Sequence, residues 1–156
     1  ARAAEIEPKN RTYVGDLAYA RFYAGSWRES ASDLLKVLEL SDDAYAMLFR
    51  YLARTRAGDA AAAGELEANA GRLKDKSWPY AAIEMYLGKR APAATLDAAD
   101  KPAQKCEAQY YIGALHLLKD NKDDAKAPLM AAAESCPVHF AEGRAAKADL
   151  KRSGLQ

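Results

Sequence analysis

The stretch "YYIGALHLLKDNKDDAKAPLMAAAESCP", residues 110–137, carries the clearest structural pattern in the chain. A small residue, Gly113, is followed twelve positions later by Ala125, and twelve positions after that comes Pro137. Leucines and aromatic residues fill the intervals at helical spacing. The pattern predicts two helices that are joined by a turn at Asp120-Asn121 and end at the proline, which cannot continue a helix.

The composition of the rest of the chain favours the same class of structure. Half of the 156 residues are hydrophobic and many of these are alanines, the best helix formers. Strand formers are scarce, since the valines are Val14, Val37 and Val138 and no alternating stretch of useful length is present. The length suffices for one domain with a sizeable core. We therefore predict an all-α protein.

Charge and hydropathy argue against two classes of partner. The net charge is +1, with basic and acidic residues mixed along the chain, so we expect no nucleic-acid partner and no membrane surface. No apolar run approaches the roughly 20 residues of a membrane span, so we expect no membrane insertion. The chain starts at Ala1 rather than at methionine, from which we expect either a processed form or an engineered one, so the lack of a signal peptide does not indicate the compartment.

Stop signals divide the chain into short helices. Gly25, Gly58, Gly88 and the Asp120-Asn121 turn lie about 30 to 33 residues apart, a period typical of helical repeats. The helices that we expect cover about residues 10–24, 27–40, 44–58, 59–74, 77–88, 91–99, 103–119, 122–135 and 138–152.

Three positions predict local details of these helices. Ser26 and Ser77 are expected to cap the helices that follow them, with Pro79 in the first turn after Ser77. Pro128 falls inside the helix over residues 122–135, where proline costs about 3 kcal/mol. We expect either a bend there or a helix that starts later.

The opening stretch resembles a tetratricopeptide repeat, a helix-turn-helix unit with small residues where its two helices cross and a proline at its exit. Gly113, Ala125 and Pro137 fit these positions, and His116 stands where the family usually has tyrosine. Three further residues fit the family's large and small apolar positions: Ile112, Leu129 and Ala132.

The N-terminal part resembles the same family. "ARAAEIEPKN" looks like the end of a repeat, with Pro8 as its exit proline, which implies that the chain begins inside an earlier repeat. Ser30 takes the place of the family's usual alanine, and Asp42 takes the exit position. The remaining matches to the family's pattern are Val14, Leu17, Ala18, Arg21, Leu34 and Val37.

The resemblance implies one repeat domain over residues 1–156 with an open concave groove. The fold would be a right-handed α-solenoid with a C-terminal capping helix, and its first helices would line the groove. Such repeats bind peptides, loops or helices of partner proteins and are rarely enzymes. The expected parts are the end of an earlier repeat (1–10), a repeat (11–43), two degenerate repeats (44–76 and 77–102), the best-matched repeat (103–137) and the capping helix (138–156).

The two cysteines stand at adjoining ends of a predicted helix pair. Cys106 opens one helix and Cys136 closes the next, and antiparallel partners place these ends side by side. A disulfide would close a loop of about 30 residues and contribute about 3 to 4 kcal/mol. It would point to an exported protein, in the periplasm if the source is bacterial. The alternative is a pair of reduced, half-buried thiols, which leaves a cytoplasmic location open.

Six residues fall where the family points side chains into its groove, and they form the predicted groove set: Tyr19, Phe22, Tyr23, Tyr110, Leu117 and Leu118. Aromatic and long apolar side chains suit the anchoring of a peptide, but plain core packing is an equal alternative. Arg54 and Arg56 are candidates for a positive rim, with ordinary surface charge as the alternative. Trp27 and Trp78 are expected in the core.

Nothing in the sequence indicates catalysis, a metal or a cofactor. His116 and His139 are the only histidines, and they are too isolated for a metal or nucleophile site. The stretch "GDAAAAGE", residues 58–65, lacks the lysine of a phosphate-binding loop. We therefore expect a non-catalytic protein-interaction module, such as an exported bacterial adaptor. The alternatives are a self-assembling structural protein and, further off, a helical enzyme or small-ligand binder.

Overall fold

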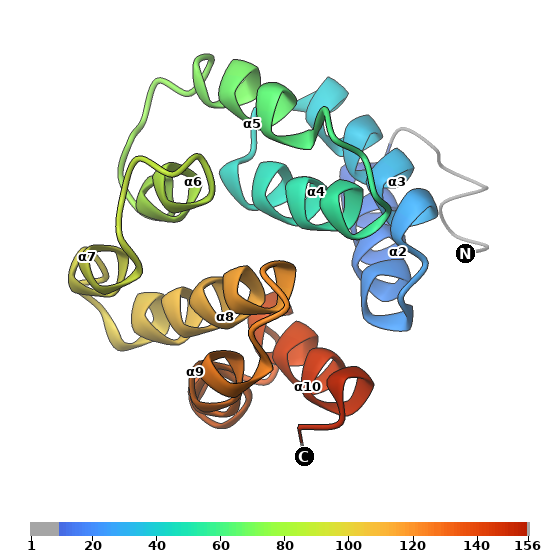
Figure 1. Cartoon of the computed structure of the whole chain (residues 1–156). Helices are drawn as coiled ribbons and strands as arrows, with labels where there is room; N and C mark the ends of the chain where they lie inside the picture. Colours follow the sequence, from blue (N-terminus) through green and yellow to red (C-terminus); the bar gives the residue numbers. More distant parts are fainter. Residues whose placement is uncertain (1–9, 156) are drawn as a thin grey trace. The chain divides into compact units, whose positions relative to one another are not determined.

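The computed structural model describes residues 10–155 of the chain (Figure 1). This part forms helices joined by turns and contains no strand, which confirms the predicted all-α class. The helices are α2 (Arg11–Ala24), α3 (Trp27–Leu40), α4 (Ala44–Arg56), α5 (Ala62–Ala70), α6 (Tyr80–Tyr86), α7 (Pro92–Asp97), α8 (Pro102–Leu118), α9 (Lys122–Ser135) and α10 (Ala141–Ser153). The predicted exit proline Pro8 and most of the predicted earlier repeat over residues 1–10 lie outside the described residues.

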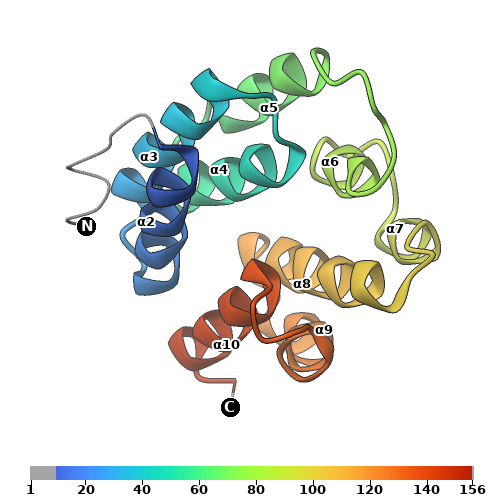
Figure 2. The same cartoon turned by 180° about the vertical axis from the view of Figure 1, so that it is seen from behind.

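Contacts divide the chain after Asp75 into two compact units. Unit 1 contains α2 to α5, and unit 2 contains α6 to α10. In unit 1, α3 packs against both α2 and α4, and in unit 2, α9 packs against both α8 and α10 (Figures 1 and 2). Each unit is therefore built around three consecutive helices with the middle one in contact with both neighbours.

The crossing of α2 and α3 is made by two small residues twelve positions apart. Ala18 and Ser30 are both fully buried, so the two helices approach closely at this point. The Ser30 hydroxyl donates a hydrogen bond of 2.9 Å to the backbone carbonyl of Ala18. This bond explains how serine takes the place of the alanine expected there, because a buried hydroxyl needs a partner.

The crossing of α8 and α9 follows the same rule more tightly. A Cβ added to Gly113 would lie 2.6 Å from Cγ and 2.8 Å from Cδ2 of Leu129, closer than real carbon atoms come. Ala125 and Leu129 are themselves fully buried. Glycine is thus required at position 113 because the leucine of the partner helix occupies the space of a side chain.

The two units also agree in the spacing of these positions. Ala18 and Gly113 are 95 positions apart, as are Ser30 and Ala125, and the same shift carries α3 (Trp27–Leu40) onto α9 (Lys122–Ser135). This internal correspondence fits the predicted repeat. The right-handed solenoid itself stays a prediction.

Gly25, a predicted stop signal, ends α2 with a φ of 81°. Glycine adopts this left-handed conformation without the steric cost of a side chain. At the starts of two helices, Asn10 caps α2 through its side-chain oxygen, and Asp43 caps α4 by accepting from the Ala46 N–H.

Other predicted caps are confirmed only in part or are wrong. Ser26 takes the N-cap position of α3, but its side chain makes no capping hydrogen bond, and its backbone N–H closes the end of α2 on Arg21. Ser77 does not cap α6, because the cap position is taken by Pro79 and the helix begins at Tyr80. Pro128 lies inside α9, which runs its full predicted length, so the alternative of a later start is also wrong.

Candidate functional site

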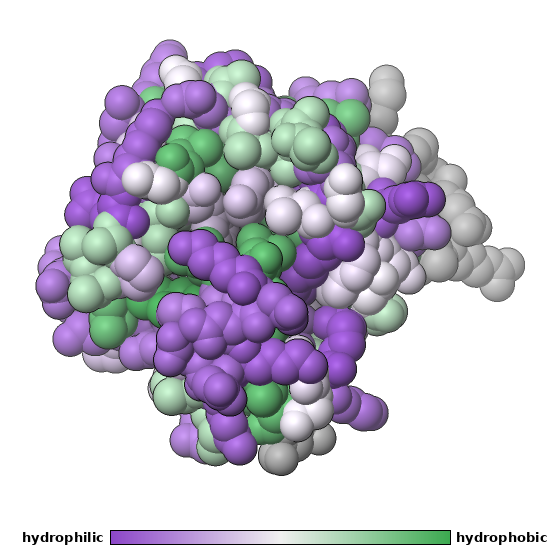
Figure 3. All heavy atoms as spheres, viewed as in Figure 1, coloured by the Kyte–Doolittle hydropathy of each residue, from purple (hydrophilic) through white to green (hydrophobic). Residues whose placement is uncertain are grey.

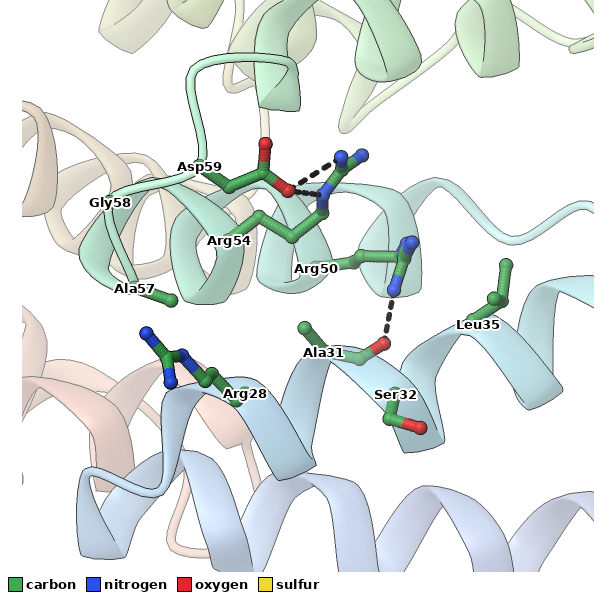
Figure 4. Close-up of a pocket in the computed structure, with 9 residues that line it drawn as sticks. All are labelled: Arg28, Ala31, Ser32, Leu35, Arg50, Arg54, Ala57, Gly58 and Asp59. Carbon is green, nitrogen blue, oxygen red and sulfur yellow. Dashed lines mark hydrogen bonds and ion pairs between the residues drawn. The ribbon is translucent and has the colours of Figure 1, made fainter.

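Unit 1 contains a pocket of about 490 Å³ between α3, α4 and the turn that follows α4. We call it the arginine pocket, because three arginines reach it from two helices (Figure 4). Its lining consists of Arg28, Ala31, Ser32, Leu35, Arg50, Arg54, Ala57, Gly58 and Asp59.

Arg50 is the buried anchor of this pocket. Only 8% of the residue is exposed, and its guanidinium holds both carboxylate oxygens of Glu65 at 2.8 and 2.9 Å. Its remaining terminal nitrogen donates to the backbone carbonyl of Ala31. Because the planar fork is held at both ends, Arg50 ties α4 to α3 and α5 in one fixed geometry.

Arg54 stands one helical turn further along α4 and pairs with two carboxylates. Its Nε and Nη2 lie 2.8 and 2.7 Å from Asp59 Oδ2, and its Nη1 lies 2.6 Å from Glu65 Oε2. Burial disfavours the charged form, but the bonds to Asp59 and Glu65 outweigh it and raise the pKa of Arg54.

The pKa values of the two carboxyl groups are lowered, because the same contacts favour their ionised forms. The Ala61 N–H and the Arg54 guanidinium lower the pKa of Asp59. Burial opposes ionisation of Glu65, but hydrogen bonds from Arg50 and Arg54 lower its pKa as well. Two ionised carboxylates therefore balance the guanidinium groups of Arg50 and Arg54.

Arg28 is the third cation of the pocket, and neither of these two carboxylates pairs with it. It is exposed, and Figure 4 shows its guanidinium aimed across the pocket toward Ala57. Within residues 10–155 it makes no hydrogen bond or ion pair. Three guanidinium groups face the two carboxylates of Asp59 and Glu65, so the pocket carries one positive charge in excess, located at Arg28.

One wall of the pocket is apolar. Leu35 leaves 40% of its surface exposed, and Ala31 and Ala57 offer only methyl groups. Gly58 turns the chain back toward Asp59 with a φ of 83°, a conformation that favours glycine. The arrangement combines the cation of Arg28 with a small apolar surface, which is suited to binding.

The predicted groove set divides between the core and the surface. Phe22 and Tyr110 are buried, so packing, the alternative that the sequence left open, applies to both. Phe22 stacks edge-on against Phe49 at 4.9 Å, and Tyr110 donates to Asp149 over 3.4 Å. The other four keep part of their surface exposed: Tyr19 and Tyr23 in unit 1, and Leu117 and Leu118 in unit 2.

The predicted positive rim is divided in a similar way. Arg54 belongs to the arginine pocket, whereas the Arg56 guanidinium lies 5.1 Å from the ring centre of Phe22 and 4.8 Å from that of Trp27. Arg56 is thus held by cation–π contacts. Trp27 and Trp78, expected in the core, are both only half-buried.

Sequence reasoning missed Arg28 and Arg50. Arg50 and Arg54 are four residues apart and so share one face of α4, with acidic residues following in the next turn and helix. That spacing was the available signal. The position of Arg28 opposite them follows only from the packing of α3 on α4.

The cysteine pair lies as predicted. Cys106 and Cys136 have their Cα atoms 5.2 Å apart and their sulfurs at disulfide distance. A Cβ on Gly143 would lie 2.8 Å from Cβ of Cys136, so α10 passes directly over this link. The pair therefore stands at the contact of α8, α9 and α10.

The histidines show no sign of a metal site. His139 lies edge-on against Phe140 at 4.9 Å, and His116 is half-buried at the end of α8. Within residues 10–155 no three side chains of the metal-binding types are grouped to hold an ion.

The surface of unit 2 and the lengths of the helices describe two further properties of the chain. On the face shown in Figure 3, hydrophilic residues cover most of the area where α8 to α10 lie, and the hydrophobic patches between them are small. In the described part of the chain, no helix has both the length and the apolar character needed to cross a bilayer.

No protein-family model, curated protein or solved structure matches the chain.

Proposed function

We propose that this chain is a non-catalytic module that binds a segment of a partner protein. The observation that carries the proposal is the internal correspondence of α2–α3 with α8–α9, in which small residues twelve positions apart make the helix crossings. This agrees with the resemblance to tetratricopeptide repeats. Stacked helix pairs present extended surfaces to partners, which is the common use of such repeats.

The candidate contact residues are the exposed members of the predicted groove set together with the arginine pocket. Tyr19 and Tyr23 in unit 1 and Leu117 and Leu118 in unit 2 keep part of their surface exposed, and aromatic and long apolar side chains anchor peptides well. The ring of Tyr19 also packs edge-on against buried Phe49 at 5.0 Å, so the test leaves it unchanged. An exported location, with Cys106 and Cys136 joined, belongs to the same proposal because a disulfide persists in oxidising compartments.

The proposal is tested by capture from the source organism followed by reconstitution. The chain serves as bait beside a variant with Tyr23→Ser, Leu117→Ser and Leu118→Ser, and both must show the same helicity by circular dichroism. Phe22 and Tyr110 are left unchanged, because their burial means that polar substitutions there would unfold the bait.

We expect the bait to capture one protein that the variant captures at least tenfold less. The purified partner should then bind the bait with saturable, one-to-one stoichiometry by calorimetry. Capture by neither protein, together with self-association that grows with concentration in sedimentation, would contradict the proposal and favour the self-assembly alternative.

A further inference from the structure

We propose that the arginine pocket of unit 1 binds the carboxylate of an acidic side chain from the partner segment, with Arg28 as its direct ligand. This assignment rests on the proposed function and names the chemistry of the partner at one site. Three features of the pocket support this site: its excess charge, the fixed frame around Arg28 and the apolar wall.

The excess charge is located at one side chain. Arg50 and Arg54 are balanced by Glu65 and Asp59 at distances between 2.6 and 2.9 Å. Arg28 faces the same hollow with no partner within residues 10–155. A guanidinium presents a planar fork of donors that matches the two oxygens of a carboxylate, so an incoming carboxylate can pair with it in bidentate fashion.

The frame around Arg28 is fixed before a ligand arrives. Arg50 is buried and holds α3 through Ala31 and α5 through Glu65, and Arg54 is held by Asp59. The walls of the hollow therefore need little reorganisation, which lowers the entropic cost of binding.

The anion that fits best carries a single charge and an apolar neighbour. The excess in the pocket is one positive charge, because Asp59 and Glu65 balance Arg54 and Arg50, so a single carboxylate neutralises it, whereas a doubly charged phosphate would leave one negative charge uncompensated. Leu35, Ala31 and Ala57 supply an apolar wall for a side chain beside the acid. The volume of about 490 Å³ falls within the range of ligand pockets.

The test is a titration of the ¹⁵N-labelled full chain with two matched hexapeptides. One alternates leucine and glutamate, and the other carries glutamine in place of each glutamate. We expect only the acidic peptide to shift the signals of Arg28, Leu35 and the turn at Gly58 and Asp59. Equal shifts with both peptides, or no shifts in this region, would overturn the proposal.

A pair of matched variants isolates the role of Arg28. Arg28→Gln and Lys126→Gln each remove one exposed positive charge, the first in the arginine pocket and the second on α9 of unit 2. We expect Arg28→Gln to weaken binding of the acidic peptide at least fivefold and Lys126→Gln to leave it unchanged. Equal effects of both variants would mean that only the overall charge matters and would overturn the site.

Titration with small anions distinguishes a peptide carboxylate from a free anion. Glutarate and inorganic phosphate are titrated alone, and binding of either as strong as that of the peptide would replace the partner segment with a free anion.

A second experiment distinguishes failure of the pocket assignment from failure of the proposed function. The captured partner is tested for binding to Arg28→Gln. A partner that binds this variant normally leaves the proposed function standing and overturns the pocket assignment. Binding of the acidic peptide through Arg28 when no partner can be captured supports the carboxylate site and contradicts only the proposed function.

Discussion

Tyr111 on α8 donates a hydrogen bond of 2.6 Å to Glu142 on α10, and both side chains are buried in unit 2. Glu107, one helical turn before Tyr111, adds a second buried carboxyl beside them and accepts from the indole N–H of Trp78. Burial is the main cause that raises the pKa of Glu142 to about 7, and the charge of Glu107 adds to it. The same burial raises the pKa of Tyr111 well above its usual value, so its hydroxyl stays a donor.

The raised pKa of Glu142 predicts that the stability of unit 2 falls as the pH rises. In the unfolded chain Glu142 ionises near pH 4.5, whereas in the folded chain it keeps its proton to about pH 7. Between these values only the unfolded state loses the proton, so folding is progressively disfavoured. Above pH 7 the decrease in the free energy of unfolding is complete and amounts to about 3 kcal/mol.

This prediction is checked by urea unfolding of the native chain and Glu142→Gln at pH 5 and pH 8. Glutamine keeps an acceptor for Tyr111 but does not ionise, so the variant should lose less stability between the two pH values. Glu134→Gln, an exposed change on α9, is the control and should follow the native chain. A native chain and a Glu142→Gln variant with parallel pH profiles would contradict the raised pKa.

The contact of Gly113 with Leu129 predicts that Gly113→Ala destabilises unit 2. The added methyl group would meet Cγ of Leu129 at 2.6 Å, and the backbone nitrogen of Leu129 lies 3.2 Å away. Overpacking of this kind costs about 1–3 kcal/mol, which outweighs the gain of about 1 kcal/mol from helix propensity.

Gly15→Ala is the matched control for this change. Gly15 also lies inside a helix, α2, but nothing stands within 4 Å of an added Cβ. The control should therefore raise the thermal midpoint slightly, whereas Gly113→Ala should lower it. Stabilisation by both changes would show that α8 and α9 do not cross as closely as described.

The cysteine pair predicts a redox-dependent stability. Alkylation without a reductant should leave the mass of the chain unchanged, and after reduction two thiols should react. The Cys106→Ser, Cys136→Ser double variant should lose about 3 to 4 kcal/mol of stability, because the link closes a loop of about 30 residues.

Hydrogen exchange locates that loss. Protection should fall in α8, α9 and α10, which meet at the link, and stay unchanged in α2, α3 and α4 of unit 1. Two reactive thiols in the untreated protein would instead support the reduced alternative.

The fork of Arg50 predicts that lysine cannot replace it. Lysine has a single ammonium group, so it cannot hold both oxygens of Glu65 and the Ala31 carbonyl together. Arg50→Lys should lower the free energy of unfolding by about 1–3 kcal/mol, as expected when buried polar groups lose their partners. Arg28→Lys, at the exposed arginine of the same pocket, should leave stability unchanged in urea unfolding.

The helices and their crossings were predictable from the sequence, whereas several helix ends were not. The predicted helix over residues 122–135 matches α9, because both of its ends carry strong local signals. The helix predicted over residues 59–74 is shorter in the structure, where α5 covers Ala62–Ala70, because alanines alone give no clear start or stop. Ser26 takes its predicted cap position without a side-chain hydrogen bond, and Ser77 is not a cap at all, because capping depends on the turn geometry before the helix.

The linear order of residues was enough to predict the all-α class, the small residues at the crossings and the closeness of Cys106 to Cys136. These features depend on helical periodicity and on distances along the chain, which are local quantities. Tertiary packing decided that Phe22 and Tyr110 are buried, that Glu142 keeps its proton and that Arg28 faces a hollow. Each of these depends on which faces of neighbouring helices meet, and periodicity within one helix does not specify its neighbour.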